Sequence, residues 1–285
     1  MNGILIINKE KGYTSRDVVN IIGKKFNTRK VGHTGTLDPA ATGVLVVCLG
    51  KALKICELLT SNDKEYIAGI TLGIETDTLD MDGKILSTET VDTSKDKIYE
   101  VVNSFNGKYM QEVPKYSAIK VNGKKLYEYA REGIDVILPK KEVNIKKIEV
   151  ISDINYHDGL VSFKIKCTVS KGTYIRSLVR DIGMTLGVKA VMDSLERTRQ
   201  GIFNIEDAYL LDDILKDNFK LISILEALDN IPRMIVNEEE AFKIKNGRTI
   251  DRFVDSDIKL IMDIHGNLLA LYKNSGDVAR VYKMF

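Results

Sequence analysis

The first fifty residues combine continuous apolar runs with one amphipathic stretch. Residues 3–8, GILIIN, form an apolar run typical of a buried strand, and GVLVVCLG at 43–50 forms a second one bounded by glycines. Between them, Thr14 or Ser15 is placed to cap a helix over RDVVNIIG, with Gly23 as its expected end. The pattern predicts a strand, a helix and a second strand.

The middle of the chain predicts two more strands and a second helix. Residues 65–85 have the pattern of a strand followed by a turn-rich acidic loop. In LVSFKIKCTVS, residues 160–170, every second side chain is apolar, which is the period of a half-buried strand. Lys171 and the glycine after it end this strand, and Thr173 is placed to cap a helix that reaches Leu186.

The pattern changes twice in the C-terminal third. Residues 205–229 are acidic with a helical period, so a connecting helical segment is expected there. After Pro232 the stretches AFKIKNG, IKLIMDIHGNLLALYK and VARVYKMF have the pattern of short strands, with HGN as a hairpin turn. We therefore expect a small all-β module of roughly 55 residues at the end of the chain.

Composition indicates a soluble globular protein. Of the 285 residues, 44% are hydrophobic and 29% are charged, which suits a chain with a sizeable core. No apolar run approaches the ~18 residues of a membrane span. The stretch MNGILIINKEKG lacks the basic leader and the long apolar core of a signal peptide. We expect a cytoplasmic protein that does not contact a membrane.

Cysteines and histidines show no metal-binding pattern. Cys48, Cys56 and Cys167 form no CxxC pair, and the three histidines are far apart and lack HExxH spacing. Cys48 and Cys167 lie in apolar or alternating runs, where a buried thiol is the ordinary interpretation. An unpaired cysteine count suits a reducing compartment. The sequence therefore predicts no metal site.

Charge is nearly balanced over the whole chain but not along it. A net charge of +2 excludes a uniformly positive nucleic-acid binder, although local basic patches remain compatible with it. Residues 113–133 are both basic and aromatic, a composition that suits RNA contact as well as a solvated hairpin. The residues concerned are Lys115, Tyr116, Lys120, Lys124, Lys125, Tyr127, Tyr129 and Arg131.

The glycine-rich segment GHTGTLDPAATGVL, residues 32–45, is not part of a nucleotide-binding P-loop. That motif requires G-x-x-x-x-G-K-[ST]. The only nearby Gly-Lys step is followed by Ala52 in place of a hydroxyl, and Leu45 stands where the first glycine belongs. The acidic loop that begins at Thr78 matches a calcium loop only in part, because position one is not Asp and a strand pattern precedes it. An acidic turn is the better interpretation of that loop.

Three residues are candidates for chemistry, each with an ordinary structural alternative. Asp38 fits the first position of a type I turn, but a carboxylate among small residues between strands is also how reactive groups are presented. Arg176 falls in the first turn of its expected helix, where the macrodipole disfavours a cation by a few tenths to ~1 kcal/mol. It is either solvated or paired with Asp181, or it faces an anion. Tyr66 is either a packing residue or a stacking surface.

Five segments resemble the blocks of one enzyme family. INKEKGYTS (7–15), GHTGTLDPAATGVL (32–45), DKEYIAGITLGIETDTLD (63–80), VPKYSAIKVNGKKLYEYAREG (113–133) and SKGTYIRSLVRDIG (170–183) occur in the family's order. They are similar to the tRNA pseudouridine synthase B family, which isomerises uridine 55 in the T loop of tRNA. The match extends from the first strand to about residue 200, and the C-terminal module resembles the family's RNA-binding PUA domain.

The resemblance implies an α+β architecture, the pseudouridine synthase fold. Its central sheet is mixed and largely antiparallel, with flanking helices. The catalytic domain would span residues 1–230, with 113–133 as a mobile insertion that clamps the RNA. A β-barrel-like PUA module would span residues 231–285. The expected contacts of the insertion are Lys115, Tyr116, Lys120, Lys124, Lys125 and Arg131.

The resemblance also assigns roles to single residues. Asp38 matches the essential catalytic aspartate, Arg176 the arginine that pairs with it, and Tyr66 the tyrosine that stacks on the target base. The expected substrate-binding residues are His33 beside the flipped nucleotide, Tyr174 and Leu195 in the uracil pocket, and Lys9 near the active site.

The implied reaction needs no cofactor, because no electrons are exchanged. One carboxylate acts as nucleophile or base, and an arginine keeps it ionised and positioned. The expected partner is the T stem-loop of tRNA, bound by a monomer without a protein partner. The alternatives are a relative that modifies ribosomal RNA with guide RNAs and a tRNA-folding chaperone with secondary catalysis. The 113–133 insertion favours the tRNA enzyme.

Overall fold

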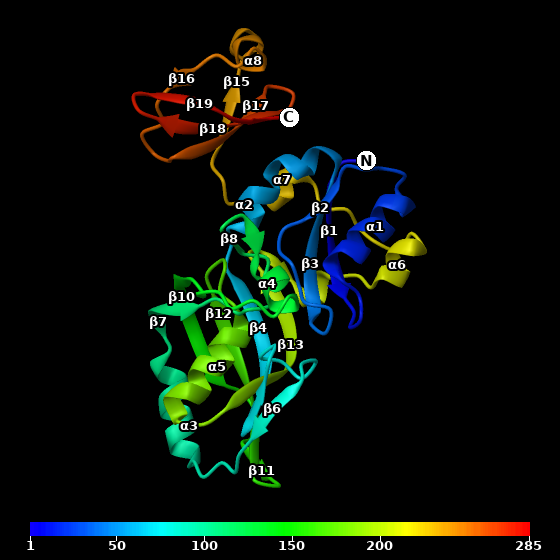
Figure 1. Cartoon of the computed structure of the whole chain (residues 1–285). Helices are drawn as coiled ribbons and strands as arrows, with labels where there is room; N and C mark the ends of the chain where they lie inside the picture. The colour runs from blue at the N-terminus through cyan, green and yellow to red at the C-terminus, as the bar shows by residue number, and fades with distance from the viewer.

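The larger part of the chain is built on one mixed sheet of ten strands, as the computed structural model of residues 1–285 shows (Figure 1). Its main path has the order β1-β3-β13-β4-β12-β10-β7, while β2, β11 and β14 pair with β3, β12 and β13. Every pairing is antiparallel except that of β3 with β13. The strands are β1 (Gly3–Lys9), β2 (Val31–His33), β3 (Thr42–Leu49), β4 (Lys64–Leu72), β7 (Gly107–Glu112), β10 (Lys140–Val150), β11 (Asn155–His157), β12 (Leu160–Val169), β13 (Ala190–Gln200) and β14 (Phe203–Asn204). The expected mixed, largely antiparallel sheet is confirmed.

Three amphipathic helices flank this sheet. Helices α1 (Ser15–Lys25), α3 (Lys95–Ser104) and α5 (Ile175–Leu186) contribute their apolar sides to a core of 33 buried residues. In Figure 1, α3 and α5 lie beside each other, and α1 lies next to β2. Shorter helical segments connect the strands: η1 (Gly50–Ile55) and α2 (Cys56–Thr60) follow β3 directly. None of the helices reaches the length and apolarity of a membrane span.

Two small hairpins extend from the sheet. The acidic loop connects β5 (Ile74–Thr76) to β6 (Ile85–Thr88), so the expected acidic turn is confirmed. In the predicted insertion, β8 (Lys120–Val121) pairs with β9 (Lys124–Lys125), and α4 (Leu126–Arg131) follows.

The predicted strands 3–8, 43–50 and 160–170 are confirmed, as are the Thr14 cap of the first helix and the Leu186 end of the second. The expected end of the first helix and the expected cap of the second need correction. Helix α1 does not end at Gly23; it continues to Lys25, and the left-handed residue that follows is Asn27, with φ of 45°. Thr173 does not cap α5. Its hydroxyl donates to the carbonyl of Ser170 at 2.9 Å, so it closes the preceding turn, and Tyr174 occupies the cap position.

The connecting segment 205–229 is not one helical stretch. It contains η2 (Ile205–Asp207), α6 (Leu211–Leu215) and α7 (Ile224–Ala227), separated by extended residues. The amide of Tyr209 donates to Ile6 at 2.9 Å, and the amide of Ile4 donates to Ile222 at 2.8 Å. The segment therefore covers the otherwise open edge of β1, and these backbone bonds replace helical ones.

A second sheet of five strands occupies the C-terminal part, in the order β15-β17-β18-β19-β16. The hairpin turn at HGN is confirmed. AFKIKNG, by contrast, is not a strand, because most of it belongs to α8 (Glu238–Lys245). The side chain of Asn237 accepts from the amide of Glu240, and the side chain of Glu240 accepts from the amide of Asn237. This capping box starts a helix, although the alternating apolar residues suggest a strand. The strands are β15 (Arg233–Val236), β16 (Ile250–Asp251), β17 (Ile258–Asp263), β18 (Leu268–Ser275) and β19 (Val278–Met284).

The second sheet packs directly on the first part of the molecule, beside α2 (Figure 1). Leu260 and Leu271 belong to the same apolar cluster as Ile4 and Val44 of the larger sheet. The ammonium of Lys54 donates to the carbonyl of Met284 at 2.6 Å. The two sheets therefore share part of their core.

Candidate active site

The glycine-rich segment connects β2 to β3 and carries Asp38 on a tight turn. The amide of Ala41 donates to the carbonyl of Asp38 at 3.1 Å, which confirms the turn predicted for Asp38 and Pro39. The hydroxyl of Ser15, at the start of α1, accepts from the amide of Leu37 at 2.9 Å and donates to its carbonyl at 3.1 Å. The turn is thus fixed to a helix on one side and a strand on the other.

Arg176 meets Asp38 and is itself held from several sides. Its Nη2 lies 3.1 Å from Oδ2 of Asp38, and its side chain is only 8% exposed whereas that of Asp38 is 40% exposed. Its Nε lies 3.6 Å from Oδ2 of Asp80, and it donates to the carbonyls of Thr78 at 3.0 Å and Tyr116 at 3.2 Å. The guanidinium is buried and fixed, and Asp38 presents its carboxylate at the more exposed end.

Asp181 is not the partner of Arg176. It pairs with Arg180 at 2.7 Å instead. A cation in the first turn of α5 is therefore compensated by two carboxylates from elsewhere in the fold, Asp38 and Asp80. Burial raises the pKa of Asp80, while the guanidinium beside it acts in the opposite direction.

The ion pair borders a cavity of about 450 Å³ whose walls include aromatic and aliphatic side chains. Tyr66 of β4, Leu195 of β13 and Tyr174 before α5 all line it, together with Asp38 and Arg176. Such a volume suits a small organic group with a few polar contacts. The structure thus brings together five of the seven predicted site residues.

A second, acidic cavity of about 340 Å³ lies on the other side of Asp38. Asp38 and Leu195 line both cavities. The carboxylates that line the acidic cavity are Asp38, Asp80, Asp82, Asp193 and Glu196. Asp38 therefore lies at the boundary between two spaces of different charge.

His33 and Lys9, the other two predicted residues, do not line the aromatic cavity. His33 lies on β2, where its Nδ1 accepts from the amide of Gly35 at 3.3 Å and burial lowers its pKa. Lys9 is fully buried, and its ammonium donates to the carbonyls of Glu10 at 3.0 Å, Tyr13 at 2.8 Å and Pro39 at 3.2 Å. Burial lowers the pKa of Lys9 to about 8. Lys9 therefore stabilises the Asp38 turn through its hydrogen bond to the carbonyl of Pro39.

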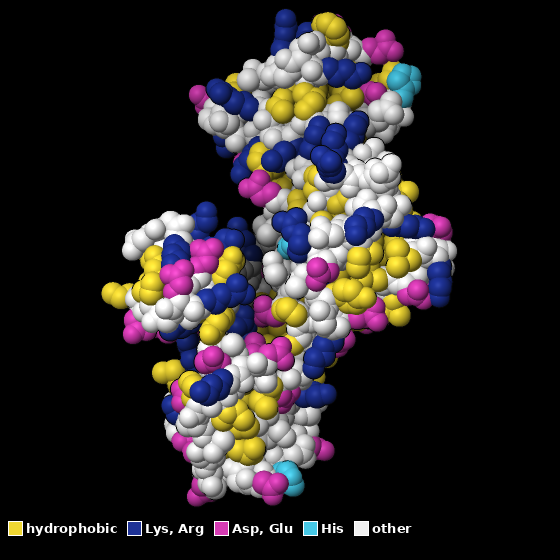
Figure 2. Space-filling model, turned by 45° about the vertical axis from the view of Figure 1, so that its right-hand side comes forward, with side chains coloured by type: hydrophobic (Ala, Val, Ile, Leu, Met, Phe, Trp, Pro, Cys, Tyr) yellow, Lys and Arg dark blue, Asp and Glu magenta, His cyan; other side chains and the backbone are white.

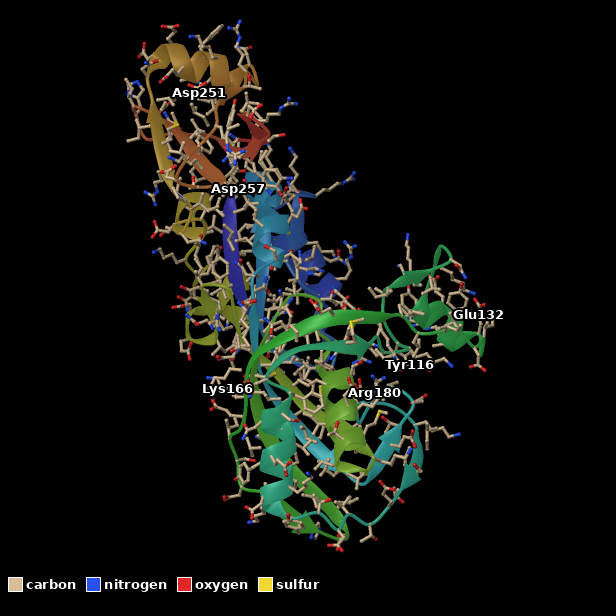
Figure 3. The ribbon with its side chains drawn as sticks, turned by 90° about the vertical axis from the view of Figure 1, so that its left-hand side faces the viewer. Tyr116, Glu132, Lys166, Arg180, Asp251 and Asp257 are labelled. Carbon is tan, nitrogen blue, oxygen red and sulfur yellow. The ribbon has the colours of Figure 1, made fainter.

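The predicted insertion forms one wall of the aromatic cavity. Tyr116, Ser117, Ala118 and Tyr127 line it. Figure 3 shows Tyr116 where the segment joins the body of the molecule and Glu132 at its outer part. In Figure 2 the segment is a lobe beside the body, with a hollow between them in which Lys and Arg side chains are visible.

Several cations of this segment contact their own neighbours. Lys124 pairs with Glu132 and lies 5.0 Å from the ring centre of Tyr129. Lys125 and Arg131 each lie 5.3 Å from the ring centre of Tyr127. A longer ion pair joins Lys115 to Asp135 at 3.7 Å, whereas no carboxylate pairs with Lys120. The structure places these residues on one lobe but does not orient all of them outward.

Sequence reasoning missed three polar residues of the site. Asp80 was assigned only to an acidic turn, yet it shares Arg176 with Asp38. Arg197 and Lys64 line the cavity although they are 1% and 7% exposed. The sequence held a signal for Lys64, because side chains two residues apart lie on the same face of a strand, and Lys64 precedes Tyr66 by two.

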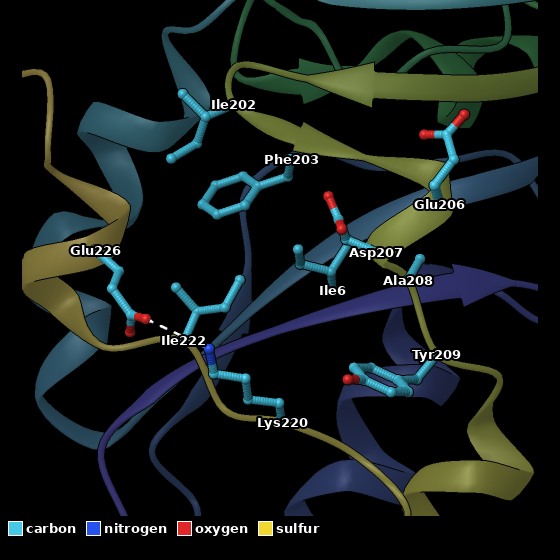
Figure 4. Close-up of a pocket in the computed structure, with 10 residues that line it drawn as sticks. All are labelled: Ile6, Ile202, Phe203, Glu206, Asp207, Ala208, Tyr209, Lys220, Ile222 and Glu226. Carbon is cyan, nitrogen blue, oxygen red and sulfur yellow. Dashed lines mark ion pairs between the residues drawn. The ribbon is translucent and has the colours of Figure 1, made fainter.

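A further cavity, of about 450 Å³, contains none of these residues (Figure 4). It lies between β1 and the connecting segment and is lined by Ile6, Phe203 and Ile222, among others. Lys220 and Glu226 form an ion pair of 3.6 Å at its edge.

Comparison with known proteins identifies the family. Residues 23–175 match the model of the TruB family pseudouridylate synthase N-terminal domain, and residues 176–231 match that of the tRNA pseudouridylate synthase B C-terminal domain. The chain is 40% identical to tRNA pseudouridine synthase B of Bacillus subtilis, over 99% of this chain and 93% of that protein. It is 43% identical to the protein of the same name from Clostridium tetani, over 90% of this chain and 91% of that protein.

Solved structures agree with this result. A chain of an H/ACA RNP bound to a substrate RNA containing 2'-deoxyuridine superposes with a TM-score of 0.71 at 26% identity. The match covers 99% of this chain and 84% of that chain. The predicted resemblance to this family is therefore confirmed: the chain belongs to the TruB family of pseudouridylate synthases.

Proposed function

We propose that this enzyme converts uridine 55 in the T loop of tRNA into pseudouridine, with Asp38 as nucleophile or base. The observation that carries the proposal is the Asp38–Arg176 pair at the edge of the cavity lined by Tyr66, Tyr174 and Leu195. A fixed carboxylate beside an aromatic cavity suits chemistry on a nucleobase that has left its stack.

The chemistry requires little beyond these residues. The bond from the ribose to nitrogen 1 of uracil breaks, the base turns, and a bond forms from the ribose to carbon 5. Carbon 5 loses a proton and nitrogen 1 gains one. Asp38 supplies the nucleophile or base for these steps. Arg176 balances its charge and fixes its position through a charge-assisted hydrogen bond.

The base must be held after it leaves the RNA stack. Flipping costs a few kcal/mol, which stacking and pocket contacts offset. Tyr66 supplies an aromatic face, and Leu195 and Tyr174 form the walls of the uracil site. His33 contacts the RNA loop from β2, and Lys9 fixes the Asp38 turn through the carbonyl of Pro39.

Residues 1–230 act as the catalytic domain and residues 231–285 as a PUA-like RNA-binding module. The lobe formed by residues 113–133 clamps the T stem-loop through shape, stacking and phosphate contacts. This lobe resembles that of the stand-alone tRNA enzymes, and it favours an enzyme that acts without a guide RNA and without a protein partner. It acts as a cytoplasmic monomer on tRNA.

Tritium release from a tRNA transcript labelled at carbon 5 of uridine tests the proposal. We expect Asp38→Asn to abolish release, while Asp82→Asn, a matched change in the neighbouring acidic cavity, keeps most of the wild-type rate. A transcript with cytidine at position 55 should release almost no tritium. Wild-type rates for Asp38→Asn, or equal release from both transcripts, would contradict the proposal.

A further inference from the structure

The aromatic cavity is strongly asymmetric in charge. Four basic side chains line it, and Asp38 is the only carboxylate among its lining residues. Arg176 is compensated by Asp38 and Asp80. The other three basic residues are Lys64, Lys171 and Arg197.

Lys64 and Arg197 are buried cations whose partners are neutral. The ammonium of Lys64 donates to the carbonyls of Thr60 at 3.0 Å and Asn62 at 2.8 Å. The guanidinium of Arg197 donates to the carbonyls of Val44 at 2.6 Å and Gly35 at 3.0 Å. These bonds satisfy N–H groups but provide no opposite charge, and a buried charge without one is costly.

Both acidic neighbours of Lys64 in the sequence pair with other cations. Asp63 pairs with Lys146 at 2.5 Å, and Glu65 pairs with Lys166 at 3.1 Å. Burial, followed by the charge of Arg197, lowers the pKa of Lys64 to about 8. The electrostatic environment of this part of the cavity therefore favours an added anion.

Lys64 and Arg197 converge on one point of the loop that carries Asp38. A Cβ built on Gly35 would lie 3.4 Å from both Nη1 of Arg197 and Cε of Lys64. Lys171, Thr173 and the first residues of α5 line the same cavity, so the positive end of that helix also faces it. Positive charge from two strands, a loop and a helix thus meets in one small space.

We propose that Lys64 and Arg197 form a binding site for one phosphodiester of the substrate RNA, the one that adjoins the flipped nucleotide. This inference rests on the proposed function, because it takes the RNA as the occupant of the cavity. The phosphate supplies the anion that the two buried cations lack. Held there, it fixes the ribose of the target nucleotide relative to Asp38.

The first test removes the charge of one RNA phosphate and leaves the protein unchanged. T stem-loop RNAs carry a neutral methylphosphonate at the linkage before or after the target uridine, and binding and tritium release are measured with the wild-type enzyme. We expect one of the two linkages to weaken binding about tenfold or more, the effect of losing a hydrogen bond between charged groups. A loss below about twofold at both linkages would overturn the proposal.

Protein variants then show which residue contacts that linkage. Lys64→Met should weaken binding of natural RNA by a similar factor, lower the salt dependence by about 0.7 in log–log slope, and lose most of its sensitivity to the neutral linkage. Lys25→Met is the control outside the cavity. Lys25 also donates to a carbonyl at the end of a short helix, that of Leu215 at 2.8 Å, although it pairs with Asp217 as well. Thermal unfolding of both variants measures the cost of losing such a cap.

The outcomes separate the two proposals. If Lys64→Met remains fully sensitive to the neutral linkage, Lys64 only caps α2 and the phosphate site is wrong. If the wild type releases tritium from natural RNA but ignores both neutral linkages, this inference fails while the proposed function stands. If the wild type releases none from natural RNA, the proposed function itself fails.

Discussion

Replacing Arg176 with methionine removes the cation that holds Asp38 while keeping an unbranched side chain. At 3.1 Å and an effective dielectric constant of about 20, the Arg176–Asp38 attraction is about 5 kcal/mol. Because the Asp38 side chain is 40% exposed, solvent screens part of this, and we take roughly 3 kcal/mol as the loss. Turnover should therefore fall by a factor on the order of 100.

The assay separates chemistry from binding. Single-turnover tritium release at saturating enzyme gives the rate of the chemical step, and RNA titration gives Kd. We expect the rate to fall about 100-fold while Kd changes less than about threefold. Arg180→Met is the matched control, because Arg180 lies one turn later on α5 and pairs with Asp181 and Glu112 instead.

The opposite pattern would refute this reasoning. A rate within about threefold of the wild type, together with a Kd raised tenfold or more, would make Arg176 an RNA contact rather than the partner of Asp38. The stability of the variant is informative as well. Asp80, whose side chain is 16% exposed, loses its cation, so Arg176→Met should also unfold at a lower temperature than Arg180→Met.

Two further predictions concern residues on either side of the Asp38 turn. The folded protein lowers the pKa of Lys9 from 10.5 to about 8, so between these values the unfolded chain binds more protons and stability rises with pH. We compare the unfolding free energies of the wild type and Lys9→Met by urea titration. From pH 8 to 10.5 the difference between them should shift in favour of the wild type by up to roughly 3 kcal/mol. A difference that stays constant over this range would show that Lys9 does not titrate there. For Tyr66, Tyr66→Phe should retain RNA affinity because the ring remains, whereas Tyr66→Leu should weaken binding by about 1–3 kcal/mol in fluorescence titration. Equal affinities of the two variants would exclude a stacking role.

The sequence predicted the interior strands well, because burial and alternation are recorded directly in residue type. GILIIN, GVLVVCLG and LVSFKIKCTVS all form strands close to the expected limits. The failures occurred where short-range polar contacts decide the structure. AFKIK alternates like a strand, but the capping box of Asn237 and Glu240 starts a helix there.

The local sequence pattern predicted less of the candidate site than of the strands. Asp38 could be recognised as a turn residue and Arg176 as a cation at an unfavourable helix position, but their contact joins distant parts of the chain. The family resemblance, not spacing, predicted their pairing. Asp80, Lys64 and Arg197 stayed unassigned because their importance comes from burial beside other charges, which appears only when strands and loops are assembled.

The single parallel contact of the large sheet has a consequence for evolutionary change. Gly43, just after the Asp38 turn, pairs with Arg197 of β13 and has φ of 98°. A Cβ at this position would lie 2.8 Å from the backbone nitrogen of Arg197 and closer still to its carbonyl oxygen. Main chain therefore meets main chain between the strand that follows Asp38 and the strand that carries Leu195. Backbone contact thus fixes the spacing of these two strands, so drift in the size of core side chains can accumulate without moving the strand after Asp38 relative to the strand of Leu195.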